Sequence, residues 1–438
     1  MTVSNPPTFA SAQTIAERAQ DHVGAGRLAA SLAALARFGL RHDGGVSRET
    51  LTATDLAARR HLIDQARALG CTVGIDDCGN LFFRRPGRED LPPVLTGSHA
   101  DTQPVGGKYD GAYGVLAGLE VIAALNAAGI ETLRPIEVVS WTNEEGSRFG
   151  PGAMGSSAFV EPARLAGYRD VTDAAGIRFG EALDAALAES HDVTRVPMAR
   201  PMAACVELHI EQGPVLEGAN VPLGVVTGIQ AVRWFRVECT GTMAHAGTTP
   251  MAVRHDAMAA AVAIAQDLYA LAPRHAAAPG TPELRLTLGR WSVAPNSVNT
   301  IPGHVTFTVD MRCLDDAALD RAEAALRAAC VRHAHAPEAV TVTRFFHREP
   351  THFPEAMLGT IERACSRASG NAGRALPMRL TSGAFHDAMY LADHCPTAMI
   401  FVPSKGGISH NAAEDTEGAD LFLGAQALAY TVAELASR

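Results

Sequence analysis

Residues Val94–Gly114 read VLTGSHADTQPVGGKYDGAYG and gather one histidine, two aspartates and several glycines into a short segment. The apolar residues at its start predict a buried strand, and its glycines allow a tight bend before a helix predicted over Ala112–Ala128. His99 and Asp101 stand two residues apart, so on an extended segment their side chains lie on one face. We interpret this segment as half of a two-metal hydrolase site at the end of a strand.

Each polar residue of this segment also has a plain structural explanation. Asp110 stands just before the predicted helix, where aspartate is a preferred N-cap. His99 by itself is more typical of a hydrogen-bonded histidine at a strand end than of a metal ligand. Taken together with the glycines, the two residues are better explained as metal ligands, with the carboxylate of Asp101 fixing the orientation of the His99 imidazole.

Two further predicted strands end in residues of the same kind. The strand Ile136–Trp141 is followed by Glu144 and Glu145, and the strand Met202–Leu208 is followed by His209. Open α/β sheets bind ligands at the carboxyl ends of their strands. A solvated acidic turn is the alternative for the two glutamates. The repetition over three strands favours a single metal site.

The candidate ligands combine imidazole nitrogens with carboxylate oxygens: His99, Asp110, Glu145, His209 and His410. Such a set suits two divalent ions, with zinc expected and manganese, cobalt or nickel as alternatives. Asp110 is central in the set and is the predicted bridge between ions about 3.5–4 Å apart. Glu144 is the predicted general base, which takes a proton from an activated water and passes it to a leaving amine. For His410 alone, an exposed loop histidine is the alternative.

Length and charge restrict the class of protein. The 438 residues exceed one ordinary core, so two domains are expected, and a net charge of −10 without a basic stripe argues against nucleic acid. Residues 1–12 lack a leader pattern and no apolar run reaches about 18 residues, so neither export nor a membrane span is expected. The eight cysteines form no CxxC pair and are typical of reduced thiols in a cytoplasmic protein. The sequence contains no GxSxG motif, so a serine nucleophile is not expected.

The pattern of predicted elements changes in the second half of the chain. The sequence predicts six elements in this order: a strand from Arg233, a helix over Pro250–Leu271, strands over Leu284–Val293 and Val305–Arg312, a helix over Asp316–His333 and a strand over Val340–Phe346. This β-α-β-β-α-β order is that of a ferredoxin-like sandwich. We expect it as a domain over 231–346, inserted into an α/β domain formed by 1–230 and 347–438. Polar turns around His245 and Asn299 are unusual in a purely structural module, although ordinary loops are the alternative.

Elsewhere the sequence predicts ordinary elements. Helices are expected over 12–38, and a further helix capped by Thr54 and Asp55 is expected to end at Leu69. The turn residues 76–80 predict a β-hairpin.

Several segments, in their order along the chain, resemble the hydantoinase/carbamoylase group of zinc-exopeptidase-like amidases: GSHADTQPVGGKYDGAYGV, TNEEGSRFGP, ELHIEQGPVLE, AHAGTTPM, PNSVNTIPG, DMR, SGAFHDAM and PSKGGISHNAAE. The resemblance runs from about residue 13 to the C-terminus. It implies a di-zinc aminopeptidase-like catalytic domain with an inserted ferredoxin-like lid and dimerisation domain, and therefore a homodimer. The group contains N-carbamoyl-L-amino acid hydrolases, β-ureidopropionases and allantoate amidohydrolases.

The resemblance implies the same ligands and base as above, with Asp101 beside His99, and it adds substrate-binding roles for Gln212, His245, Asn299 and Arg312. A guanidinium suits a substrate carboxylate, and the histidine and asparagine suit a developing oxyanion. Two positions depart from the group's pattern, with Phe385 where glycine is frequent and Ser157 where arginine is common.

The implied reaction is hydrolysis of the carbamoyl C–N bond of an N-carbamoyl amino acid. Allantoate amidohydrolase and β-ureidopropionase are close alternatives, and a dipeptidase or aminoacylase is a more distant one. A binding protein without activity is disfavoured because every catalytic role is filled.

Overall fold

The computed structural model describes residues 11–272 and 283–438. The chain forms two compact units. The first comprises Met1–Thr227, Phe353–Ser382 and His386–Arg438, and the second comprises Gly228–His352 and Gly383–Phe385. The expectation about a leader peptide concerned residues 1–12, most of which lie outside the described residues.

The first unit is built on a large mixed sheet. Its strands are β1 Thr72–Ile75, β2 Leu81–Arg85, β3 Val94–His99, β4 Ile136–Trp141, β5 Thr194–Arg195, β6 Ala204–Ile210, β7 Gly224–Ile229, β14 Thr351–His352, β15 Met378–Ser382 and β16 Thr397–Val402. They lie in the order β14-β7-β16-β6-β3-β4-β2-β1-β5, and β15 pairs with β7. The neighbours β16, β6, β3 and β4 run parallel to one another. The predicted hairpin is confirmed, since β1 and β2 pair antiparallel.

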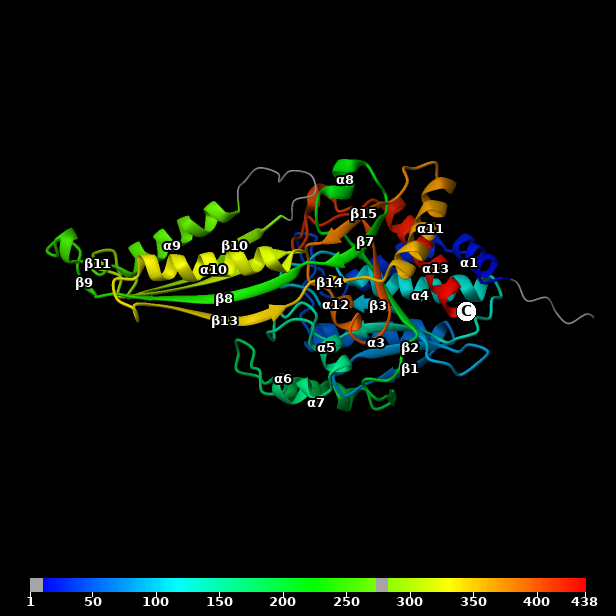
Figure 1. The fold of residues 1–438 in the computed structure, drawn as a ribbon. Coiled ribbons are helices and arrows are strands. Elements are labelled where there is room, and N and C mark those ends of the chain that lie inside the picture. The colour runs from blue at the N-terminus through cyan, green and yellow to red at the C-terminus, as the bar shows by residue number, and fades with distance from the viewer. Residues whose placement is uncertain (1–10, 273–282) are drawn as a thin grey trace, which may run out of the picture. The chain divides into compact units, whose positions relative to one another are not determined.

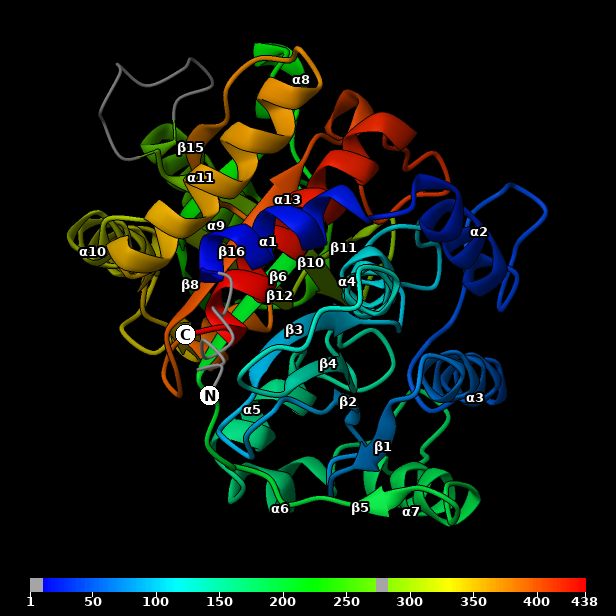
Figure 2. The same ribbon diagram turned by 90° about the vertical axis from the view of Figure 1, so that its right-hand side faces the viewer.

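Helices cover both faces of this sheet. The helices of the first unit are α1 Ala12–Asp21, α2 Ala25–Ala36, α3 Ala53–Ala68, α4 Ala112–Ala127, α5 Met154–Val160, α6 Arg164–Tyr168, α7 Phe179–Glu189, α8 Val215–Ala219, α11 Glu355–Asn371, α12 Ala388–Leu391 and α13 Gly418–Ala436. Successive side chains of a strand point to opposite faces. Thr96 and Val138 therefore lie against Gly118 of α4, whereas Val139 packs with Phe159 of α5. Figure 2 shows α4 and α13 beside β3 and β6, which they contact.

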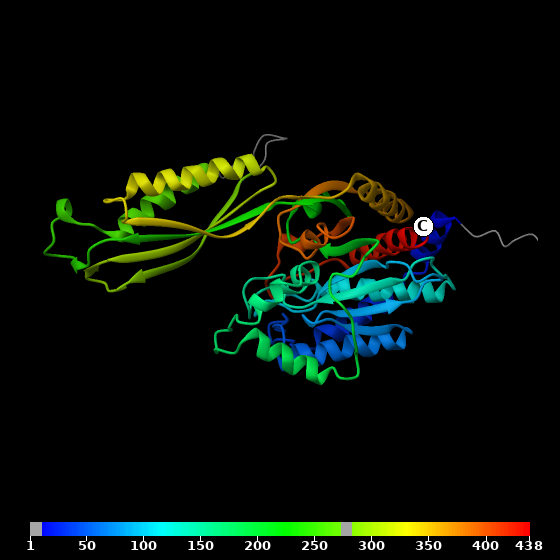
Figure 3. The ribbon, with the colours of Figure 1, turned by 60° about the horizontal axis from the view of Figure 1, so that its bottom comes forward.

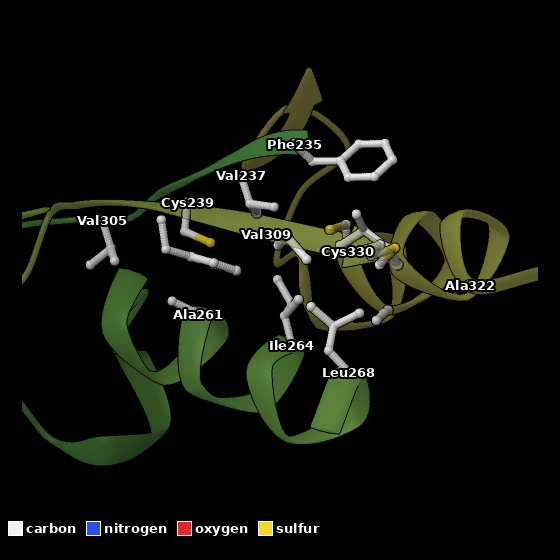
Figure 4. Packing of buried hydrophobic residues seen from close by; sticks show 14 of the residues in the cluster. Phe235, Val237, Cys239, Ala261, Ile264, Leu268, Val305, Val309, Ala322 and Cys330 are labelled. Atoms are coloured by element: carbon white, nitrogen blue, oxygen red, sulfur yellow. The ribbon is translucent and has the colours of Figure 1, made fainter. Parts of the chain in front are cut away.

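The second unit contains a four-stranded sheet and two long helices. The strands β8 Ala231–Thr240, β10 Arg285–Ala294, β12 His304–Cys313 and β13 Val340–Arg348 lie in the order β10-β12-β8-β13, with every neighbouring pair antiparallel. The helices α9 Ala257–Leu271 and α10 Asp316–His333 pack against this sheet (Figures 1 and 3). Side chains such as Val237, Ile264 and Val309 meet between helix and strand (Figure 4). The β-α-β-β-α-β order and this strand order confirm the predicted ferredoxin-like fold.

Two details of the helix boundaries were predicted wrongly. The hydroxyl of Thr52 caps α3 by accepting the N–H of Asp55, so Thr54 and Asp55 lie inside the helix. The helix predicted from Pro250 begins only at Ala257, because Asp256 caps α9 and the residues before it form a single 3₁₀ turn. Over the described residues, no helix combines the length and hydropathy that crossing a bilayer requires.

Candidate metal centre

Asp110 offers its two carboxylate oxygens to two different sets of side chains in the first unit. Oδ1 lies 3.3 Å from Nε2 of His209 and 3.7 Å from Nε2 of His99. Oδ2 lies 3.2 Å from Nε2 of His410, and that nitrogen lies 3.3 Å from Oε2 of Glu145. We call His99–Asp110–His209 the inner group and Asp110–Glu145–His410 the outer group. In each group the donor atoms lie within 4.8 Å of one another. The structure therefore brings the five candidate ligands together around one carboxylate.

The sheet explains why these distant residues meet. His99 ends β3, His209 lies near the end of β6, and the two adjacent glutamates follow β4. These strands run parallel as neighbours, so their carboxyl ends form one edge. His410 comes from the loop after β16, which is parallel to β6. The prediction that strand ends would converge is confirmed by this order.

Both buried imidazoles present the same nitrogen to Asp110. Nδ1 of His99 lies 2.9 Å from the carbonyl oxygen of Asp101, and Nδ1 of His209 lies 2.9 Å from that of Ile210. Because a carbonyl only accepts hydrogen bonds, we assign the proton to Nδ1 in each ring. In the neutral ring Nε2 then has a lone pair that can bind a metal ion, as is usual for ligating histidines.

Close packing and unusual backbone conformations shape the centre. Gly111 has φ of +60°, and a Cβ there would collide with the His99 ring, so glycine is required. Asn143, Gln212 and His410 also have positive φ, at +59°, +56° and +53°. Left-handed conformations cost free energy in residues other than glycine and collect at functional sites.

Asp101 holds the turn that carries the two glutamates. Its carboxylate oxygens accept the backbone N–H groups of Glu144 and Glu145, each at 3.3 Å. Its contact with His99 is made by the carbonyl oxygen, and the carboxylate stays 3.8 Å from Nδ1. Glu144 in turn places Oε2 3.4 Å from Nε2 of His99. The base candidate therefore lies beside the inner group.

The buried carboxylates of the centre have strongly shifted pKa values. Burial would raise the pKa of Asp110, but hydrogen bonds from the imidazoles, His209 first, hold it well below its usual value. Burial and nearby carboxylates, Asp387 first, raise the pKa of Glu144 far above normal. Burial and Asp110 raise the pKa of Glu145 to about 8. Buried carboxylates that repel one another are stabilised as anions by nearby positive charge, which divalent cations would increase. The donor set and its charge thus fit metal ions.

Comparison with known proteins identifies the family. Residues 95–434 match peptidase family M20/M25/M40. The chain belongs to this family. Members are metal-dependent, in agreement with the clustered ligands among the described residues.

Within this family the chain is one of the hydantoinase/carbamoylase amidases, and the resemblance found in the motifs is confirmed. It is 38% identical to an N-carbamoyl-L-amino-acid amidohydrolase of Rhizobium meliloti, over 94% of this chain and 97% of that one. It is 36% identical to an allantoate amidohydrolase of Escherichia coli strain K12, over 92% and 96%. A solved hydantoinase/carbamoylase family amidase from Burkholderia multivorans has a TM-score of 0.82 at 42% identity, covering 95% of this chain and 98% of that one.

In this M20 protein Gln212 lies on the metal centre itself. Its side-chain amide donates to Oδ2 of Asp110 at 3.0 Å and to the hydroxyl of Ser409 at 3.2 Å. Within the described residues its Oε1 is buried and has no hydrogen-bond partner. The oxygen is therefore left for a ligand of the centre, and the substrate-binding role of this residue stays a prediction.

The other substrate-binding candidates belong to the second unit, at two ends of its sheet. His245 lies opposite Thr300 where β9 Ala244–His245 pairs with β11 Thr300–Ile301, and the backbone N–H of Ala246 donates to the carbonyl oxygen of Asn299. These strands lie at one end of the unit (Figure 1). Arg312 lies near the opposite end of β12, which starts at His304. At about 3.4 Å per residue, roughly 27 Å of strand separates the two ends.

The side chains of these candidates are partly prepared for binding. Nδ1 of His245 accepts the backbone N–H groups of Gly247 and Thr248, at 3.0 and 3.3 Å, so its proton lies on Nε2. Arg312 is held by Asp310 at 2.9 Å and donates to the carbonyl oxygen of Gly383 at 3.0 Å. His245 therefore presents its Nε2–H group on an exposed side chain, whereas the guanidinium of Arg312 is held in place by Asp310 and Gly383.

The two positions that depart from the group's pattern differ in their surroundings. Ser157 is fully buried in α5, and its hydroxyl bonds to the carbonyl oxygen of Ala153 and lies 2.9 Å from the hydroxyl of Tyr168. Phe385 packs edge-on against Phe346 of β13, with ring centres 6.0 Å apart.

Sequence reasoning assigned no role to some residues that hold the centre. Gln103 donates to both carboxylate oxygens of Glu145, from its backbone N–H at 3.1 Å and from its side chain at 2.7 Å. Glu414 accepts the backbone N–H groups of Tyr109 and Asp110. The only signal was their place inside motifs that also contain ligands, which indicates position but not contact.

Proposed function

We propose that the chain is a metal-dependent amidohydrolase that cleaves the carbamoyl C–N bond of N-carbamoyl amino acids. The observation that carries this proposal is Asp110, whose two oxygens face two separate ligand groups with Glu144 alongside. Water and R–NH–CO–NH₂ would give the free amino acid, carbon dioxide and ammonia. The relatives named N-carbamoyl-L-amino-acid amidohydrolase support this substrate class.

The centre would hold two divalent ions, one in the inner and one in the outer group, with Asp110 between them. Imidazole and carboxylate donors suit zinc, and manganese, cobalt and nickel are the alternatives. Ions bound there would supply the Lewis acid that polarises the substrate carbonyl and activates a water molecule.

Glu144 would move the proton in this reaction. Its carboxylate takes a proton from the attacking water and delivers it to the nitrogen that leaves. Asp101 keeps this carboxylate in reach by fixing the backbone of the turn that carries it. Burial excludes bulk water from the exchange, since Glu144 is 7% exposed.

Arg312 would bind the substrate carboxylate, while His245 and Asn299 would stabilise the oxyanion. Within one unit these groups lie at opposite ends of a sheet, too far apart for one small substrate. We therefore propose a homodimer in which each site takes Arg312 from one chain and His245 with Asn299 from the other. The second unit would then serve as lid and dimerisation domain.

A second candidate is an allantoate amidohydrolase, which is favoured by the relatives of that name in Escherichia coli and Bacillus subtilis. The test is a panel assay on chelator-treated protein that is reloaded separately with zinc, manganese, cobalt or nickel. N-carbamoyl-L-amino acids, N-carbamoyl-β-alanine and allantoate are compared by ammonia release. Preference for allantoate selects the second candidate, and turnover of none of them rejects both.

We also propose a cytoplasmic location. All eight cysteines are buried and free, in keeping with a reducing compartment.

A further inference from the structure

Glu414 joins the two loops that carry the outer group. It lies on the loop that contains His410 and is 2% exposed. Its Oε1 accepts the backbone N–H groups of Tyr109 at 3.0 Å and Asp110 at 3.1 Å. Its Oε2 lies 3.0 Å from the hydroxyl of Ser409, the residue next to His410. One carboxylate therefore fixes the backbone at Asp110 relative to the backbone at His410.

A second path connects the same residues through side chains. The Ser409 hydroxyl also lies 3.2 Å from Oδ2 of Asp110, the oxygen that faces the outer group. The hydroxyl has one proton, so it donates to Glu414 or to Asp110 at any moment. When a cation occupies Oδ2 of Asp110, the proton is best placed on the Glu414 side. The contact thus links Glu414 to the outer position.

The carboxylate of Glu414 lies in a tightly packed site with neutral hydrogen-bond partners. A Cβ on Gly107 would collide with the carboxylate of Glu414, so glycine is required in the loop before Asp110. The hydrogen-bond partners of Glu414 in the described residues are neutral groups, two backbone N–H groups and one hydroxyl. Glu414 therefore acts through these hydrogen bonds and not through an ion pair of its own.

Another buried glutamate shows what a purely structural role looks like. Glu120 of α4 accepts the backbone N–H of Gly24 and also pairs with the guanidinium of Arg27, at 2.6 Å. It joins two elements as Glu414 does, but it has a cation of its own. Glu414 differs because its hydrogen-bond partners are neutral groups and because it lies beside the candidate ligands.

The outer group depends on such support more than the inner group does. The side chains of His99 and His209 are 2% and 1% exposed, and each ring is fixed by a backbone carbonyl. The side chain of His410 is 50% exposed, and its backbone is in the left-handed region. Burial and backbone hydrogen bonds therefore fix the inner histidines, whereas the half-exposed His410 depends more on the conformation of its loop.

We propose that Glu414 is a positioning residue for the outer metal position, and that it keeps Asp110 and His410 in register. This inference rests on the proposed two-metal site. It requires that loss of the hydrogen bonds made by the Glu414 side chain weakens the outer ion while the inner ion stays bound. Glutamine should replace it well, because its amide oxygen can accept both N–H groups and its NH₂ can donate to Ser409.

The test is a zinc titration of the metal-free protein by calorimetry, with cobalt absorption spectra as a second readout and the ureido assay in parallel. The wild type should take up two ions per chain. Glu414→Ala should keep one ion at wild-type affinity and lose about tenfold or more for the second, a typical effect of residues behind metal ligands. Glu414→Gln should stay within about threefold of wild type for both ions. Glu120→Ala, the matched control, should lower the melting temperature without changing either affinity.

Three results would overturn the inference: unchanged binding in Glu414→Ala, equal weakening of both ions, or the same pattern in Glu120→Ala. If Glu414→Ala does not fold, Ser409→Ala replaces it and must weaken the second ion alone. Fewer than two ions in the wild type also rejects it. If the wild type binds two ions but hydrolyses no ureido compound, the proposed function fails while the titration still decides the role of Glu414.

Discussion

At the residue scale, the roles of two adjacent glutamates can be separated by experiment. Glu144 lies beside His99 without belonging to either ligand group, whereas Glu145 belongs to the outer group. Glu144→Gln keeps a hydrogen-bonding side chain but cannot take a proton. We expect kcat to fall by about 100- to 10,000-fold with two ions still bound. Glu145→Gln is the control, and elemental analysis should show that it binds less metal than Glu144→Gln. Unchanged turnover in Glu144→Gln would remove it from the base role.

Two histidines of the centre also predict a pH dependence of metal uptake. Burial lowers the pKa of His209, but the hydrogen bond with Asp110 overcomes this effect and raises it to about 9. The same carboxylate raises the pKa of His410 to about 9. A metal ion binds only the neutral ring, so uptake at neutral pH must release protons, and zinc affinity must fall as the pH falls. Calorimetry in buffers of different protonation enthalpy counts these protons, and identical heats in all buffers would contradict the assignment.

The same shifts affect the stability of the metal-free protein. A histidine with a raised pKa stabilises the fold fully below its unfolded value of about 6.5. That contribution is lost as the pH rises through about 9. Metal-free protein should therefore lose stability over this range in thermal melts, while zinc-loaded protein should not follow it.

At the element scale, one buried arginine connects a helix end to the strand of the metal centre. Arg48 is 2% exposed and donates to the carbonyl oxygens of Leu35 and Phe38 near the end of α2. It also donates to that of Ala100, directly after β3. Burial lowers its pKa to about 10, so it stays charged at neutral pH. Arg48→Met would leave three carbonyl groups without this donor.

We expect Arg48→Met to lower the free energy of unfolding by roughly 2–5 kcal/mol, since buried polar groups would lose their partner. Urea denaturation of the zinc-loaded protein measures this change. Arg41→Met is the control, because Arg41 forms a surface ion pair with Asp43, and such pairs contribute little to stability. Equal effects of the two substitutions would show that Arg48 does not join these elements.

These elements also show what a sequence can predict. Strands such as β3 and β4 follow from apolar runs, and their polar ends follow from the chemistry of the residues after them. The start of α9 was missed because Pro250 looks like a helix start, while the cap is Asp256. Arg48 was not recognised, since arginine is usually exposed and its partners lie far away in sequence. Local signals predict elements and ligands, whereas contacts between distant segments need the fold.

At the scale of the whole molecule, the proposed homodimer makes a prediction that a single chain cannot meet. Arg312 and His245 lie at opposite ends of the sheet of one unit, so each site would combine Arg312 of one chain with His245 of the other. Arg312→Ala and His245→Ala should each be almost inactive as homodimers. In a mixed dimer, one of the two sites receives both wild-type residues and the other receives neither.

Mixing the two inactive variants under conditions that exchange subunits should therefore restore activity, toward one active site per mixed dimer. Random exchange puts about half of the chains into mixed dimers, so the recovered rate should approach about one quarter of the wild-type rate, by the symmetry of a two-fold assembly. The control is a mixture of His245→Ala with Asn299→Ala, since each site would take both of these residues from the same chain. That mixture should regain no activity, because every mixed site lacks one of the two groups. Recovery in the control, or none in the first mixture, would contradict a site shared between two chains.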